Sequence, residues 1–108
     1  MGDITKAPRR RVNKKLTAAT SLTPEDAGVI FLANVGAFTV TLPPVAGAEG
    51  IEFEFVKTTT NANAVTIDGF GSETINGSAN LATIDAQFDS ATVVSDGTAW
   101  YISRSKIA

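Results

Sequence analysis

The sequence of 108 residues contains no cysteine and no histidine, and only one methionine, one tryptophan and one tyrosine. Without cysteine, neither a disulfide nor a thiolate-bound metal can brace the fold, which suits a reducing compartment. Without histidine as well, the chain lacks the usual neutral-pH proton shuttle and the commonest zinc ligands. Most enzyme classes therefore lose their best candidate residues, and we expect no catalytic activity, no cofactor and no metal site.

Long apolar runs are missing too. No stretch approaches the ~20 residues that span a bilayer. The basic N-terminus is followed by polar residues and not by the hydrophobic stretch of a signal peptide. We therefore expect a soluble, unexported chain with no membrane partner.

Positive charge is scarce after residue 16. Residues 1–16 hold six basic and one acidic residue, a net charge of +5, whereas residues 17–108 hold three basic and ten acidic residues, a net charge of −7. The formal net charge of −2 hides these two segments of opposite sign. We expect two parts: an extended basic N-terminal arm over residues 1–21 and a single domain over residues 22–108.

From residue 29 onward the sequence of the domain favours β-strands. Short runs of Val, Ile, Phe and Thr are separated by Gly, Pro, Asn and Asp clusters about every ten residues, the spacing of a sandwich or barrel. We expect an all-β fold, a small antiparallel β-sandwich of jelly-roll type with about seven or eight strands. A domain of roughly 90 residues buries only about 60 to 65% of the surface that its unfolded chain exposes, so self-association is an obvious source of further stability.

Strict alternation predicts which side chains face inward. Three segments carry the pattern most clearly: apolar Phe38, Val40 and Leu42; Ile51, Phe53 and Phe55 against outward Glu52 and Glu54; and Val65 with Ile67. A short strand is expected around residues 74–75. In the last strand Trp100 and Ile102 should share one side and Tyr101 the other.

Two local signals predict turns. Asp96-Gly97 between two apolar runs predicts a two-residue hairpin that pairs the last two strands antiparallel. Residues 22–28, "LTPEDAG", predict one helical turn with Thr23 as N-cap and Pro24 at the first position.

Carboxylates are the only remaining candidates for chemistry. Glu52 and Glu54 project from one strand face about 7 Å apart, a spacing that glycoside hydrolysis can use, although a solvated strand face explains them better. Asp68, Glu73, Asp85 and Asp89 offer oxygen ligands without the spacing of a calcium loop, and stabilisation of their own turns is the stronger interpretation.

The basic arm admits three hypotheses. It can bind nucleic acid through phosphate contacts, it can be a solvated tail without a partner, or it can dock on an acidic protein surface. The −7 domain would repel a polyanion held by the arm, so we expect no nucleic-acid partner and favour protein docking. The docking residues are expected to be Lys6, Arg9, Arg10, Arg11, Lys14 and Lys15.

The order of several motifs resembles a known family. The runs "LTPEDAGVIFLAN", "FTVTLPP", "GAEGIEFEFVK", "AVTIDGFGSETINGS" and "VVSDGTAWYI" follow one another over residues 22–102. This order is similar to that of a small β-module of tailed bacteriophages, found in tail fibres and in capsid decoration (cement, head-outer) proteins. The arm lies outside the matching region.

The resemblance implies a virion structural protein, usually trimeric, without catalytic activity. We expect a decoration protein on the outer surface of the phage head, made in the host cytoplasm, whose partners are the major capsid protein and further copies of itself. The alternative is a tail-fibre or baseplate module that recognises host glycan, with Trp100 and Tyr101 as a sugar platform.

Overall fold

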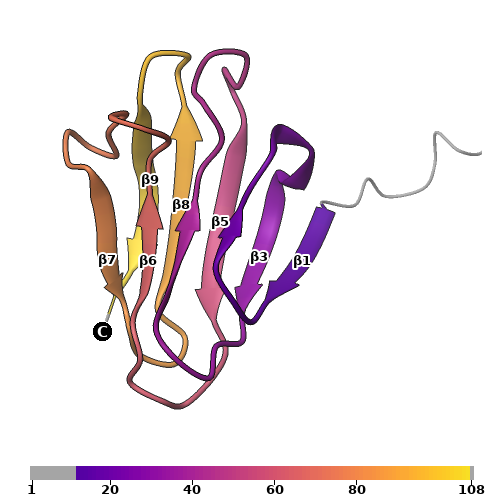
Figure 1. The fold of residues 1–108 in the computed structure, drawn as a ribbon, viewed down its shortest axis with the longest axis vertical. Helices are drawn as coiled ribbons and strands as arrows, with labels where there is room; N and C mark the ends of the chain where they lie inside the picture. Colours follow the sequence, from indigo (N-terminus) through magenta and orange to yellow (C-terminus); the bar gives the residue numbers. More distant parts are fainter. Residues whose placement is uncertain (1–11, 108) are drawn as a thin grey trace, which may run out of the picture.

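Short segments of alternating apolar residues form most of the strands in the computed structural model. The structure describes residues 12–107, except for the side chains of residues 12, 13 and 81–83. Among these residues, nine strands make a five-stranded sheet in the order β1-β3-β5-β8-β9 and a four-stranded sheet in the order β2-β4-β6-β7 (Figure 1). The strands are β1 (Val12–Leu16), β2 (Thr20–Ser21), β3 (Gly28–Leu32), β4 (Phe38–Thr41), β5 (Glu52–Lys57), β6 (Val65–Asp68), β7 (Asn80–Ile84), β8 (Ser90–Ser95) and β9 (Trp100–Lys106). The all-β, two-sheet prediction is confirmed.

The strand directions differ from the prediction. From β1 to β6 the chain changes sheet after every strand, so β1, β3 and β5 are neighbours in one sheet and β2, β4 and β6 in the other. All four of these pairings are parallel, and only β5–β8, β6–β7 and β8–β9 are antiparallel. In Figure 1, β1, β3 and β5 point the same way and β8 points the opposite way. The expected antiparallel pairing therefore holds for β5–β8, β6–β7 and β8–β9 and is wrong for the four pairings among β1 to β6. The side-chain period of two could not separate the two cases, because it is common to parallel and antiparallel sheets.

The boundary of the arm also needs correction. Strand β1 pairs with β3 from Val12 opposite Gly28 to Leu16 opposite Leu32, and β2 pairs with β4. Residues 12–16 and 20–21, which the prediction assigned to the arm, thus belong to the two sheets. Lysines are common on edge strands, where they discourage pairing with other chains, so "VNKKL" is compatible with β1 at the sheet edge.

The core lies between the sheets and is centred on three aromatic residues. The rings of Phe53 and Trp100 lie 5.8 Å apart and those of Phe53 and Phe55 lie 6.3 Å apart, and all three side chains are fully buried. Aliphatic residues from both sheets complete the core: Ile30, Leu32, Val40, Leu42, Val65, Ile67, Ile75, Ile84 and Val93. Alternation therefore predicted the inward-facing residues of β4, β5 and β6 correctly. It also placed Trp100 and Tyr101 on opposite sides of the last strand, and the structure shows that Trp100 is the inner one.

The predicted turns form with changes in detail. The β8–β9 hairpin closes over residues 96–99, four residues instead of two, because the Asp96 carboxylate Oδ1 accepts hydrogen bonds from the backbone N–H groups of Thr98 (2.8 Å) and Ala99 (3.0 Å). Gly97 supplies the left-handed φ of 90° that this loop requires. Residues 74–75 form no full strand, although Ile75 makes isolated bridges to Ser78 and Trp100.

The helical turn is confirmed as a 3-10 turn, η2 (Pro24–Asp26), preceded by Thr23 and starting with Pro24. Within residues 12–107 there is no helix with the length and apolar character needed to cross a bilayer.

Candidate functional site

The predicted arm divides into two groups. Lys6, Arg9, Arg10 and Arg11 lie outside the described residues, whereas Lys14 and Lys15 lie in β1. Since neighbouring residues of a strand face opposite sides, the two lysines point away from each other. Lys14 is opposite Ile30 of β3, and the exposed Lys15 is opposite Phe31. The structure therefore does not gather these two cations into one patch.

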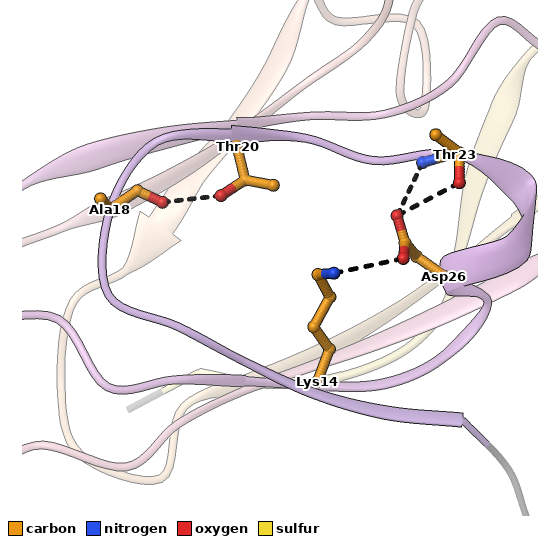
Figure 2. Close-up of polar contacts among 5 residues, drawn as sticks. All are labelled: Lys14, Ala18, Thr20, Thr23 and Asp26. Carbon is orange, nitrogen blue, oxygen red and sulfur yellow. Dashed lines mark hydrogen bonds and ion pairs between the residues drawn. The ribbon is translucent and has the colours of Figure 1, made fainter.

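Lys14 has a partner within the chain. Its Nζ lies 3.4 Å from Oδ1 of Asp26 in η2 (Figure 2). The other carboxylate oxygen, Oδ2, accepts hydrogen bonds from the Thr23 N–H at 2.9 Å and from the Thr23 hydroxyl at 3.3 Å. One carboxylate thus joins the edge strand to the turn that leads into β3.

This arrangement changes the acidity of Asp26. Burial alone would raise the pKa of the Asp26 carboxyl, but the Thr23 N–H and the Lys14 ammonium together outweigh burial and hold the pKa below its ordinary value. Asp26 therefore stays ionised at neutral pH and keeps its contact with β1.

The outward carboxylates Glu52 and Glu54 lie on the central strand of the five-stranded sheet. Glu52 is opposite Val94 of β8, and Glu54 lies between Val29 of β3 and Thr92 of β8. Because β5 pairs with β3 on one side and with β8 on the other, the two carboxylates lie on the outer face of the sheet and not at its edge.

Other carboxylates stabilise loops. Oδ2 of the buried Asp89 accepts hydrogen bonds from the backbone N–H groups of Asp85 (3.2 Å) and Ala86 (3.1 Å), and Oε1 of Glu73 accepts one from the Val45 N–H (3.0 Å). In the described part of the chain, no three Asp, Glu, His or Cys side chains come together as a metal site would require. For Asp89 the interpretation as a turn stabiliser is confirmed, whereas the Glu73 side chain bonds the β4–β5 loop instead of its own turn.

Sequence analysis missed a polar cluster at the end of the sandwich where β3 and β5 finish. Lys57 is 0% exposed, and its Nζ donates to the backbone oxygens of Thr59 (3.1 Å) and Asn61 (2.6 Å) and to the side-chain oxygens of the same two residues (3.1 and 3.0 Å). The signal was present, because Lys57 continues the inward series of Phe53 and Phe55.

Asn34 connects this cluster to the preceding strand. Its Nδ2 donates to the backbone oxygens of Gly36 and Asn63, both at 3.0 Å, and its Oδ1 accepts from the Thr59 hydroxyl at 2.8 Å. The Asn61 side chain in turn donates to the Asn34 carbonyl at 2.7 Å. The β3–β4 and β5–β6 loops are therefore held together by side-chain hydrogen bonds, which makes this a structural cluster.

The proposed aromatic platform is not assembled. Trp100 is 0% exposed, and only Tyr101, which is 45% exposed, remains at the surface. A sugar platform of both residues is therefore wrong, because the two side chains lie on opposite faces of β9.

Neither a scan of protein-family models nor a search of curated proteins finds a match to this chain.

Proposed function

We propose that this protein is a capsid decoration, or cement, protein of a tailed bacteriophage, located on the outer surface of the assembled head. The observation that carries the proposal is the continuity between the basic run and β1. The last two cations of the run, Lys14 and Lys15, lie in β1, and β1 is held by five register positions against β3 and by the Lys14–Asp26 ion pair. A pull on the arm is thereby transmitted to the five-stranded sheet.

The arm residues have different roles in this proposal. Lys6, Arg9, Arg10 and Arg11 pair with acidic side chains of the major capsid protein, where Arg can grip carboxylates with two parallel hydrogen bonds. Lys15, exposed on β1, adds to this charge. Lys14 acts as an anchor of the strand, since it already contacts Asp26.

The body contributes by self-association and by avidity. Copies of the chain, in a trimer as the family resemblance implies, would bring several arms to the lattice at once, and linked weak contacts give tight overall binding. Binding to the assembled lattice and not to free capsid subunits stabilises the lattice by mass action. No nucleic acid or membrane is involved.

The direct test replaces the arginines and keeps the chain length. A variant with Arg9→Gln, Arg10→Gln and Arg11→Gln should remain folded and lose binding to purified undecorated heads at physiological salt. The matched control, Arg104→Gln with Lys106→Gln, removes the two cations of β9 and should bind normally. Deletion of residues 1–16 is a poorer test, because the deletion also removes β1.

Electron microscopy of decorated particles gives the second measurement. Density for the protein on the outer face of the head supports the proposal, and normal occupancy of the triple-glutamine variant would contradict the role of the arm. Density only in the tail would favour the alternative, a host-glycan module, for which Tyr101 is the remaining exposed aromatic residue of the expected pair.

A further inference from the structure

A tight turn lies within the long connection between β6 and β7. Ile75 and Ser78 exchange backbone hydrogen bonds of 2.7 and 3.0 Å. The two residues between them, Asn76 and Gly77, have left-handed φ angles of 51° and 83°. A two-residue turn with positive φ at both central positions is of type I′, for which Asn-Gly is a preferred pair. We call residues 74–78 the docked turn.

Three hydrogen bonds hold the docked turn against the edge of β9. The Trp100 N–H donates to the Thr74 carbonyl and the Asn76 N–H donates to the Trp100 carbonyl, both at 3.0 Å. The third bond uses a side chain, because the Ile102 N–H donates to Oδ1 of Asn76 at 2.9 Å. The Asn76 side chain thus extends the contact between the turn and the edge strand by one residue of β9.

Asn76 is the one asparagine of the chain that glycine follows. The backbone nitrogen of the residue after an asparagine can attack the side-chain Cγ and close a cyclic imide, and a side chain on that residue hinders the attack. Glycine has no side chain, and apart from its chain neighbours nothing lies within 4 Å of the place where a Cβ of Gly77 would stand. Both residues are exposed. Water and hydroxide therefore reach the reacting atoms.

The docked turn favours this reaction in two ways. The Ile102 N–H is aimed at Oδ1 of Asn76, the oxygen on which negative charge develops when Cγ becomes tetrahedral, and such a donor lowers the barrier. The Gly77 N–H carries the proton that must leave. Among the hydrogen bonds of residues 12–107, none has this N–H as its donor, so a base from solvent can take the proton.

We propose that Asn76 is a site of spontaneous deamidation in the folded protein. The Gly77 nitrogen bonds to Cγ, the Cγ–Nδ2 bond breaks, and Nδ2 leaves as ammonia with the proton lost from Gly77. Water then opens the imide. Cleavage between Cγ and the ring nitrogen gives aspartate, whereas cleavage between the main-chain carbonyl carbon and this nitrogen gives isoaspartate. Water is the only co-reactant, and the inference does not depend on the proposed function.

The two products have different effects on the docked turn. Aspartate keeps an oxygen at the place of Oδ1, so the Ile102 N–H keeps its acceptor. Isoaspartate leads the main chain through Cγ, which adds a carbon atom to the backbone of a turn that has room for only two residues. The isoaspartate form should therefore lose the hydrogen bonds of the turn to Trp100 and Ile102 and leave this part of the β9 edge open.

Peptide mapping by mass spectrometry tests the reaction. The full-length protein is incubated at mildly alkaline pH and physiological temperature, and Asn76 should convert at least about tenfold faster than any other asparagine. An Asn76 that stays intact in the folded protein, while the same residue converts in urea-unfolded protein, would overturn the inference.

A second Asn-Gly pair provides the matched control. Ala64→Gly places glycine after the exposed Asn63, for whose Oδ1 no hydrogen-bond donor is found in the described part of the chain. Asn63 in this variant should convert more slowly than Asn76 in the same molecule. Equal rates would contradict the contribution of the Ile102 N–H. Circular dichroism establishes that the variant is folded.

Hydrogen exchange measures the structural effect of each product. Ion exchange separates the deamidated forms from the starting protein, and freshly purified Asn76→Asp supplies the aspartate form directly. The Trp100 and Ile102 amides should exchange faster in the isoaspartate form than in wild type, and at the wild-type rate in Asn76→Asp. The same exchange rates in all three proteins would show that the docked turn survives the extra carbon atom, contrary to the inference.

Discussion

The strands β1 to β6 and the strands β7 to β9 are built from the same alternating pattern and paired in opposite ways. In the first group, parallel partners are two strands apart along the chain, and the chain crosses to the other sheet between them. In the second group β8 and β9 are joined directly by four residues. Because both groups share the alternating pattern, the connecting loops and not the strand patterns determine whether strands pair in parallel or antiparallel.

The two groups also close their loops differently. The β8–β9 loop is held by one local carboxylate, that of Asp96. The β3–β4 and β5–β6 loops are joined by the Lys57 and Asn34 cluster, whose hydrogen bonds link residues up to 29 positions apart. Parallel strands cannot be joined by tight hairpins. Their loops are instead held in place by side-chain hydrogen bonds between residues distant in the sequence.

The largest expected effect comes from Trp100, where β9 packs on Phe53 of β5. Trp100→Ala should lower the free energy of unfolding by about 3 to 5 kcal/mol, enough to unfold much of a small domain. Trp100→Phe should lower the free energy of unfolding less than Trp100→Ala does, because the phenylalanine variant loses only part of the ring and removes the Trp100 Nε1–H. In the described part of the chain, this nitrogen is the one buried polar side-chain atom without a hydrogen-bond partner. Urea unfolding followed by circular dichroism measures both; equal losses would show that packing around the indole does not limit stability.

A smaller effect is expected at Lys57, in the parallel group. Lys57→Met keeps the length of the side chain and leaves the oxygens of Thr59 and Asn61 without their donor, which should cost about 2 kcal/mol. Lys106→Met, an exposed lysine at the end of β9, should change stability by less than about 0.5 kcal/mol. Since removal of a buried charge can also be neutral, an unchanged urea midpoint for Lys57→Met would mean that the four hydrogen bonds only offset the desolvation of the ammonium.

The smallest effects compare one aspartate in each group. The hydrogen bonds from the Ala99 and Thr98 N–H groups lower the pKa of Asp96, as the contacts described above lower that of Asp26. A carboxyl with a depressed folded-state pKa stabilises the fold above its unfolded pKa of about 3.9, and this contribution is lost as pH falls through the folded value. Wild-type stability should therefore decline below about pH 4.

Substitution separates the two contributions. Asp26→Asn removes an ion pair near the surface and should cost at most about 1 kcal/mol at pH 7, with a smaller difference from wild type at pH 3. Asp96→Asn should behave in the same direction at the hairpin. Thermal unfolding at the two pH values provides the measurement, and a difference that grows on acidification would contradict the assignment.

Sequence analysis predicted the interior well and the connectivity poorly. Alternation alone placed Phe53 and Phe55 inside and put Trp100 and Tyr101 on opposite sides of their strand, because a period of two needs only local information. It could not decide parallel against antiparallel pairing, which depends on where each loop crosses. The same limit applies to β1, since the charges of Lys14 and Lys15 marked residues 12–16 as arm when the apolar Leu16 in fact enters the core.

The candidate site was predictable only in part. The charge of the basic run is visible in the sequence, and four of its six residues lie outside the described range. The ion pair of Lys14 with Asp26 is not visible in the sequence, because it joins an edge strand to a residue twelve positions later in a turn.

The solitary tryptophan gives the molecule an internal optical reporter. Its indole is sealed beside Phe53 and away from water, so native protein should emit at short wavelength and shift to the red when the core opens. No dye or engineered label is needed. The intactness of this fold can accordingly be followed in a dilute sample and at any pH, with every signal change assigned to one known position.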